Sequence, residues 1–260
     1  MIARETAGLR YFQFDSLLSE NLFQAVFSRQ GGVSPDPWSS LNLGSTVGDD
    51  PVRVSENKSK LLAAIGYFPD QLAQIHQVHS AHVEVVNKPV DRNSVLVRGD
   101  VMISNTPGLL MLMRFADCVP ILFFDPVKNT AGIAHAGWEG TVKEVVIAAV
   151  KKLEKQFGTD PSDLITGIGP SIGPDHYEIG EDVIEEVKKT FPDNWEEILI
   201  EGPDSVKLDL WEANKISLKK AGVRHIETAE ICTACNVKDW YSHRAENGRT
   251  GRFAAVIGLK

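Results

Sequence analysis

Three short apolar runs follow one another closely in the middle of the chain, at residues 109–113, 119–124 and 130–134. Runs of this length and composition, with polar segments between them, predict strands. The polar segment 125–129 suits a hairpin turn. Strands this close together favour antiparallel neighbours over the helical crossovers of a purely parallel sheet. The sequence therefore predicts a mixed sheet.

Further strands and helices are expected along the rest of the chain. Apolar positions recur with a period of about 3.6 at residues 142–153, which predicts an amphipathic helix. Thr141 and Glu144 have the spacing of a capping box at its start, and Gly222 suits the end of a later helix. The other predicted strands are 83–86, 164–168, 206–210 and 253–257, and the other predicted helices are 182–189 and 211–221. We expect an α/β fold, a single-domain α/β sandwich with a mixed sheet that spans residues 1–260.

Composition argues against several classes of protein. The 35 acidic residues outnumber the 27 basic ones, and a net charge of −8 argues against a nucleic-acid-binding protein. No segment approaches the roughly 20 apolar residues that cross a bilayer, so we expect no membrane association. The first residues mix charges and lack the apolar core of a signal peptide, which predicts a cytoplasmic protein. Three cysteines are too few for a disulfide framework.

Three segments each carry one side chain that can bind a metal ion or support a nucleophile: His79, Cys118 and His135. Two imidazoles and a thiolate fill three corners of a tetrahedral zinc site and leave the fourth open. If runs 119–124 and 130–134 form a hairpin, Cys118 and His135 meet at one edge of the sheet. The approach of His79 does not follow from this pattern. The alternative interpretation is a small buried cysteine and two hydrogen-bonded histidines.

The surroundings of these residues leave several assignments open. Histidines recur at His76, His79 and His82, and the pattern does not select among them. Asp117 is suited to orient an imidazole or to stabilise a turn. The glycine-rich segment after His135 leads into a helix, and its backbone suits either a bound anion or a tight turn.

Two other motifs carry functional side chains. Cys232 and Cys235 form a Cys-x-x-Cys pair, but the sequence has no second cysteine pair to complete a structural zinc site. We therefore interpret these cysteines as packing residues. The polar segment 242–252 carries several arginines, Arg244 among them. Arginine side chains match the geometry of phosphate and carboxylate groups, although such a loop is also typical of solvated surface.

Taken together and in this order, the motifs of the chain resemble the laccase-domain family, whose bacterial members are the YfiH- and YlmD-like proteins. The similarity runs from about Phe27 to nearly the end of the chain. The matching strings are Ser28-Arg29-Gln30-Gly31-Gly32-Val33-Ser34, Ser40-Leu41-Asn42-Leu43-Gly44, Val47-Gly48-Asp49-Asp50, Gln77-Val78-His79, Ala116-Asp117-Cys118-Val119-Pro120, His135-Ala136-Gly137-Trp138, Gly169-Pro170-Ser171-Ile172-Gly173 and Arg249-Thr250-Gly251-Arg252.

The resemblance implies a fold similar to that of certain cysteine hydrolases and one zinc ion held by His79, Cys118 and His135. It implies a purine nucleoside phosphorylase that acts on adenosine, inosine, guanosine and methylthioadenosine, with adenosine deaminase activity in addition. Nucleosides and phosphate are the expected partners. Asp117 is the candidate proton carrier among the catalytic residues. Arg29 and Arg244 are candidate substrate-binding residues, because guanidinium groups bind phosphate well.

Three positions depart from the family pattern. The Gln-Val-His string is usually followed by glycine, where this chain has Ser80, and the segment after Gly173-Pro174 often carries cysteine, where it has Asp175-His176. The His-Ala-Gly-Trp string is usually followed by a basic residue, and this chain has Glu139 there. The substitution places a negative charge where a positive group would help to hold phosphate. We therefore expect altered phosphate affinity or substrate preference.

Three alternative functions are considered beside this one. The first is a metal-free cysteine hydrolase with Cys118 as the nucleophile and a histidine as the base. The second uses copper, which outcompetes zinc for such ligands, although seven histidines without a His-x-His pair argue against a multicopper oxidase. The third is a binding module without turnover. The sequence does not indicate which nucleoside is preferred, and it does not indicate the oligomeric state.

Overall fold

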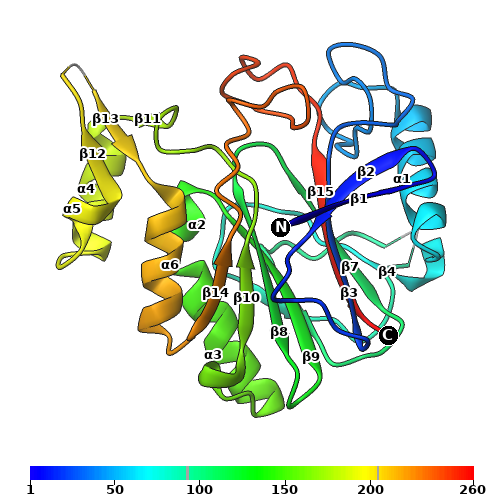
Figure 1. Cartoon of the computed structure of the whole chain (residues 1–260), viewed down its shortest axis with the longest axis horizontal. Coiled ribbons are helices and arrows are strands. Elements are labelled where there is room, and N and C mark those ends of the chain that lie inside the picture. Colours follow the sequence, from blue (N-terminus) through cyan, green and yellow to red (C-terminus); the bar gives the residue numbers. More distant parts are fainter. Residues whose placement is uncertain (92–93, 204) are drawn as a thin grey trace.

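The computed structural model describes residues 1–91, 94–203 and 205–260. These residues form two six-stranded sheets and one three-stranded sheet, with helices packed around them (Figure 1). The first sheet has the strand order β1-β2-β3-β15-β7-β4, and the second has the order β14-β10-β8-β9-β6-β5. The third sheet, β11-β13-β12, lies beside helices α4 and α5 at one end of the molecule.

The bounds of the elements are as follows. The first sheet contains β1 (Ile2–Thr6), β2 (Leu9–Gln13), β3 (Leu22–Phe27), β4 (Leu72–Ala73), β7 (Leu110–Phe115) and β15 (Phe253–Leu259). The second contains β5 (Val83–Val85), β6 (Val101–Ser104), β8 (Val119–Asp125), β9 (Thr130–Ala136), β10 (Ile165–Ile168) and β14 (His225–Thr228). The third contains β11 (Glu178–Ile179), β12 (Leu199–Glu201) and β13 (Val206–Leu208). The helices are α1 (Pro51–Ala64), α2 (Trp138–Val142), α3 (Val145–Phe157), α4 (Glu181–Thr190), α5 (Trp195–Ile198) and α6 (Leu210–Lys220).

Both large sheets are mixed. β4 runs parallel to β7 in the first sheet, and β5 and β14 run parallel to their neighbours β6 and β10 in the second. The other pairs in these two sheets are antiparallel, including the hairpin of β8 and β9, in which Pro120 pairs with His135. The predicted α/β fold with a mixed sheet and the predicted hairpin are both confirmed.

The central strands are apolar on both faces because each sheet is covered on both sides. On β8, Ile121 and Phe123 belong to the core that contains α3 and α6, whereas Leu122 and Phe124 belong to the core between the two sheets. Successive side chains of a strand point to opposite faces, which produces this alternation. Burial of one such side chain contributes about 1.5–3 kcal/mol. A strand buried on both faces therefore reads as one continuous apolar run.

Helices form the outer layers on either side of the paired sheets. α1 packs Leu61 and Leu62 against Leu110 and Val256 on the outer face of the first sheet. α3 and α6 cover the second sheet on the opposite side of the molecule, so the order of layers is helix, sheet, sheet, helix (Figure 1). Within the described part of the chain, no helix is long and apolar enough to cross a membrane.

Two of the sequence predictions need correction at their boundaries. The helix predicted at 142–153 is α3, but it begins only at Val145, because Glu144 has a positive φ of 57° that separates it from α2, where Val142 lies. Thr141 therefore does not cap it, and its hydroxyl accepts a hydrogen bond from Asn214 at 3.1 Å. The strand predicted at 206–210 ends at Leu208, because the side chain of Asp209 caps α6. Gly222, with a φ of 93°, follows the end of α6 as predicted.

Several edge, polar or short elements are absent from the sequence prediction. β1 and β2 lie at one edge of the first sheet, where most of their side chains are at least partly exposed. α1 carries many polar residues and buries only Val54, Asn57, Leu61 and Leu62. β6 is short, and β4 and β11 are shorter still. Such segments are recognisable only from the neighbours that they pack against.

Gly167 provides a test of the packing between the sheets. A Cβ at this position on β10 would lie 2.6 Å from Cδ2 of Phe14, whose side chain is fully buried. We expect Gly167→Ala to destabilise the fold by about 1–3 kcal/mol, because the ring has no free space into which to move. Urea denaturation measures this. The double variant with Phe14→Leu should recover part of the loss, and an unchanged unfolding midpoint in Gly167→Ala would contradict the packing.

Candidate metal centre

The hairpin of β8 and β9 brings Cys118 and His135 together. Val119 pairs with Ala136 and Pro120 with His135, so Cys118, just before β8, lies beside Gly137, just after β9. A Cβ on Gly137 would lie 2.7 Å from the Sγ of Cys118. Only glycine leaves room for the thiol at this position.

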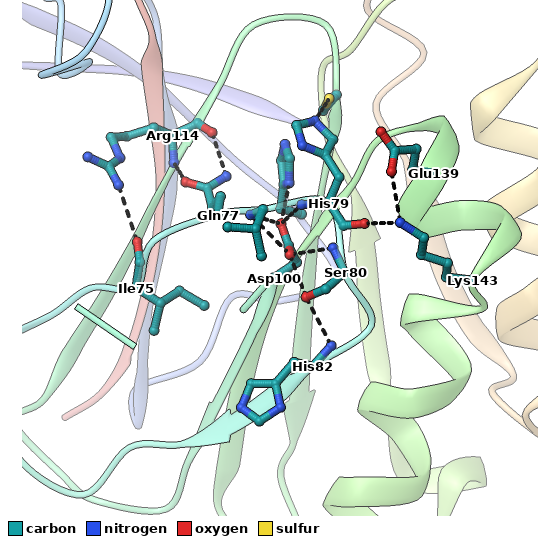
Figure 2. Close-up of polar contacts among 12 residues, drawn as sticks. Ile75, Gln77, His79, Ser80, His82, Asp100, Arg114, Glu139 and Lys143 are labelled. Atoms are coloured by element: carbon teal, nitrogen blue, oxygen red, sulfur yellow. Dashed lines mark hydrogen bonds and ion pairs between the residues drawn. The ribbon is translucent and has the colours of Figure 1, made fainter. Parts of the chain in front are cut away.

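His79 reaches the same place from the loop between β4 and β5. Its backbone has a positive φ of 59°, and the carboxylate of Asp100 holds the loop by accepting the N–H groups of Val78, His79 and Ser80 at 2.6–3.2 Å (Figure 2). The hydroxyl of Ser80 donates to the same carboxylate at 2.8 Å. Asp100 thus fixes a strained loop that carries His79.

The three side chains converge at their donor atoms. The Sγ of Cys118 lies 3.8 Å from Nε2 of His79, and one ligand atom from each of Cys118, His79 and His135 lies within 4.8 Å of the others. His76 and His82, by contrast, are exposed, and His82 faces Glu84 at 3.4 Å. The structure therefore selects His79 from the three histidines that the pattern left open.

Asp100 also determines which nitrogen of His135 is available. The carboxylate already accepts several N–H groups, so the contact of 2.9 Å with Nδ1 of His135 is a hydrogen bond that the imidazole donates. In the neutral ring this leaves the lone pair on Nε2 for a metal ion. Burial lowers the pKa of His135, which keeps the ring in this neutral form. Burial would raise the pKa of Asp100, but hydrogen bonds from His135 and Ser80 outweigh it and hold that pKa well below its usual range.

The thiol of Cys118 is a poor nucleophile in the absence of a cation. Burial, followed by the charge of Asp117, raises the pKa of Cys118 to about 12. The thiol is then protonated at neutral pH, and the thiolate is the reactive form. A metal ion bound beside it would deprotonate the thiol outright.

Asp117 does not orient an imidazole. Its backbone has a φ of 82°, and its carboxylate accepts the hydroxyl of Thr233 at 2.7 Å and the backbone N–H of Arg244 at 2.6 Å. The orienting carboxylate is Asp100, which the sequence analysis did not identify. The available signal was an aspartate directly before the apolar strand Val101–Ser104.

The two candidate arginines lie in different surroundings. Arg29 is largely buried; its guanidinium donates to the carbonyl groups of Ser39 and Val237 at 2.7 and 2.8 Å and pairs with Glu246 at 2.9 Å. Arg244 is exposed, and its guanidinium donates to the carbonyl of Glu178 at 2.8 Å. Of these two candidates, Arg244 is the one whose backbone is held by Asp117, the residue next to Cys118.

Glu139 lies on α2, one turn before a lysine that offsets its charge. The Nζ of Lys143 pairs with the carboxylate of Glu139 at 2.8 Å and donates to the carbonyl of His79 at 2.7 Å (Figure 2). More than a third of the surface of each side chain is exposed to solvent. The positive charge missing at position 139 is thus present one turn later, at the rim of the site.

Known proteins resemble the chain over most of its length. Residues 23–260 match the family described as multi-copper polyphenol oxidoreductase laccase. A purine nucleoside phosphorylase of Deinococcus radiodurans is 37% identical over 235 residues, which cover 90% of this chain and 88% of that protein. The purine nucleoside phosphorylase YlmD of Geobacillus stearothermophilus is 36% identical over 245 residues, with 90% and 88% covered.

Solved structures agree with this assignment. The crystal structure of YlmD from Geobacillus stearothermophilus superposes with a TM-score of 0.92 at 33% identity and covers 99% of this chain and 98% of that one. The hypothetical protein YfiH of Bacillus licheniformis gives a TM-score of 0.91 at 28% identity, with 99% of both chains covered. As the resemblance of its motifs predicted, the chain belongs to the multi-copper polyphenol oxidoreductase laccase family, together with the YfiH and YlmD proteins.

Proposed function

We propose that this protein is a zinc-dependent purine nucleoside phosphorylase that acts on adenosine, inosine, guanosine and methylthioadenosine and also deaminates adenosine. The convergence of His79, Cys118 and His135 at one point carries the proposal. Relatives that match about nine-tenths of the chain bear the name purine nucleoside phosphorylase, which supports phosphorolysis as a reaction. A cytoplasmic location would suit such substrates.

The donor set fits zinc. Two imidazole nitrogens and one thiolate are ligands that zinc accepts, and three protein ligands leave a position for substrate. Copper could occupy the same donors, because it binds them more tightly. When bound, the zinc ion would serve as a Lewis acid toward the purine and toward water. The chain itself contributes the neutral tautomer of His135, fixed by Asp100, and the position of His79, fixed by the same carboxylate.

Phosphate would bind between two cations at the rim. Phosphorolysis brings an anion to the ribose, so a positive side chain must hold it beside the nucleoside. Lys143 donates to the carbonyl of His79, and Arg244 is tied through its backbone to Asp117. We assign phosphate to these two side chains. Arg29, with its guanidinium committed to carbonyl groups and Glu246, is assigned to supporting the loops around it.

Deamination needs a carboxylate that can move protons, and Glu139 suits this role better than Asp117. Both oxygens of Asp117 accept hydrogen bonds, so we assign that residue to positioning. Glu139 is partly exposed, and it is joined through Lys143 to the backbone carbonyl of His79, one of the three candidate ligands. A carboxylate beside the site can act as general acid and base.

A metal-free cysteine hydrolase is the second candidate. The observation in its favour is the pair of His135 and Asp100, because such enzymes orient a catalytic imidazole with a third polar group. Against it stands the protonated thiol of Cys118. Metal content and alkylation distinguish the two candidates.

Substitution of the proposed zinc ligands tests whether zinc and activity are lost together. Adenosine is incubated with the protein, with and without phosphate; adenine reports phosphorolysis, inosine reports deamination, and hypoxanthine reports both in succession. Cys118→Ala and His79→Ala should each lose about one zinc ion per chain and reduce turnover by at least about two orders of magnitude. His76→Ala, which alters an exposed histidine of the same loop, should retain both.

Two results would refute this prediction. Turnover that persists in zinc-free protein and stops on thiol alkylation would establish the cysteine hydrolase. A folded, zinc-loaded protein that converts no nucleoside would indicate a binding module.

The second prediction concerns Asp100. The pKa of Asp100 is lower in the folded chain than in the unfolded chain, where it is about 3.9. The carboxylate therefore stabilises the fold at pH values above about 3.9, and this contribution is lost as the pH falls through the folded pKa. Asp100→Asn should therefore destabilise the protein at pH 7 far more than in acid. It should also weaken zinc binding by about 10–100-fold.

Chelator competition and urea denaturation at several pH values measure these effects. Asp125→Asn is the matched control, because Asp125 is also fully buried and accepts backbone N–H groups, those of Val127 and Lys128. Zinc affinity in Asp125→Asn should stay unchanged. Equal zinc affinity in Asp100→Asn and the parent protein would contradict the orienting role.

The ion pair between Glu139 and Lys143 offers a way to separate phosphorolysis from deamination. Glu139→Gln should lower KM for phosphate, because the charge of Lys143 is no longer offset, and should lower kcat for deamination by about 100-fold or more. Lys143→Met should raise KM for phosphate and leave the zinc content unchanged. Lys151→Met, on α3, is the control for a general loss of positive charge. Parallel changes of both reactions in Glu139→Gln would refute the division of roles.

A further inference from the structure

A second group of metal-binding side chains lies away from the His79, Cys118 and His135 centre. Asp175 and His176 belong to the loop between β10 and β11, and Cys232 and Cys235 follow β14 (Figure 1). One ligand atom from each of the four residues lies within 4.8 Å of the others. Cys232 is buried, and the other three are exposed, so an ion can enter from solvent.

Distances between the donor atoms lie within a few tenths of an ångström of those around a tetrahedral ion. Zinc bonds of about 2.0–2.3 Å place the ligand atoms of a tetrahedron about 3.3–3.8 Å apart. The Nδ1 of His176 lies 3.5 Å from the Sγ of Cys235 and 3.9 Å from that of Cys232. The carboxylate of Asp175 lies 3.5 Å from the Sγ of Cys235 and 3.0 Å from Nδ1 of His176.

The backbone holds the two loops together independently of these side chains. Ser171 and Cys232 form a parallel bridge, in which the N–H of Ser171 donates to Ile231 at 3.2 Å and the N–H of Thr233 donates to Ser171 at 2.9 Å. The four side chains therefore come from two segments that the backbone pairs with each other.

Two backbone N–H groups fix the position of the sulfur of Cys232. It accepts the N–H of Gly173 at 3.2 Å and that of Cys235 at 3.4 Å, which holds it beside the other three side chains. Packing alone would require no N–H groups directed at this sulfur.

We propose that Asp175, His176, Cys232 and Cys235 bind a structural zinc ion. Four protein ligands close the coordination sphere, which is the arrangement of structural rather than catalytic zinc. The sequence contains no second cysteine pair to match Cys232 and Cys235, and an aspartate and a histidine take its place. The interpretation of these cysteines as packing residues is thereby replaced.

The ion would stabilise the surroundings of Cys118. Thr233, between the two cysteines, donates its hydroxyl to Asp117 at 2.7 Å, and the N–H of Ile172 donates to the carbonyl of Asp117 at 3.0 Å. Both loops of the proposed site thus hold the residue that precedes Cys118. A zinc ion between them would fix this contact without touching substrate.

Metal stoichiometry tests the proposal directly. The full-length protein is purified under reducing conditions, equilibrated with zinc, freed of loose metal and analysed by mass spectrometry for zinc per chain. We expect about two zinc ions in the parent protein and about one in Cys235→Ser. Cys235→His, which keeps a zinc ligand, should restore the second ion. Because Cys235 is exposed, the serine variant should fold, and circular dichroism verifies this.

Comparison with Cys118→Ser separates this site from the proposed catalytic centre. Loss of one ion in each single variant and of both in the double variant supports two independent sites. Equal zinc content in the parent protein and Cys235→Ser would overturn the proposal, as would an intact mass showing a Cys232–Cys235 disulfide in the zinc-treated protein. Zinc lost in Cys235→Ser but fully retained in Cys118→Ser would instead overturn the catalytic centre and leave this site standing.

Discussion

The carboxylate of Asp100 is the interaction on which the candidate centre depends. It accepts three backbone N–H groups of the loop 78–80 and the Nδ1–H of His135, which lies on β9. Its own backbone extends the same connection, because the N–H of His135 donates to the carbonyl of Asp100 at 2.8 Å. Two of the three donors are therefore positioned by one fully buried residue. The buried charge is tolerated because the carboxylate accepts these hydrogen bonds and that of the Ser80 hydroxyl.

The part of the centre that is local in sequence was predictable. A short polar turn between two apolar runs determined the hairpin, and the hairpin determined that Cys118 and His135 meet. The position of His79 was beyond such reasoning, because it depends on contacts between its loop and Asp100 in the folded chain. No periodicity records a contact of this kind. The resemblance to the family selected His79, and the geometry shows why His76 and His82 are not equivalent to it.

The fold shows the same division between local and long-range information. The long buried strands β7, β8 and β15 were recognisable as apolar runs, whereas α1 and the edge strand β1 carry too many polar residues to stand out. The break between α2 and α3 was hidden, because Val142, Val145 and Val146 continue the helical spacing across Glu144. Glu139 on α2 and Lys143, the residue just after α2, lie before this interruption, and Lys143 donates to the carbonyl of His79. That residues 1–260 form a single domain stays a prediction.

Asp100 and Asp117 show how the same residue type produces opposite effects on either side of the centre. Asp100 points toward His135 and makes its Nε2 available, which prepares a ligand. Asp117 has a positive φ, and its carboxylate accepts hydrogen bonds from Thr233 and Arg244. No hydrogen bond between Asp117 and Cys118 is observed, and the negative charge of Asp117 disfavours the thiolate form of Cys118. The thiolate is thus unfavourable alone and favourable beside a cation. Asp100 leaves Nε2 of His135 available, and burial together with the charge of Asp117 keeps Cys118 protonated in the absence of a cation, which is the arrangement that the proposed metal ion would need.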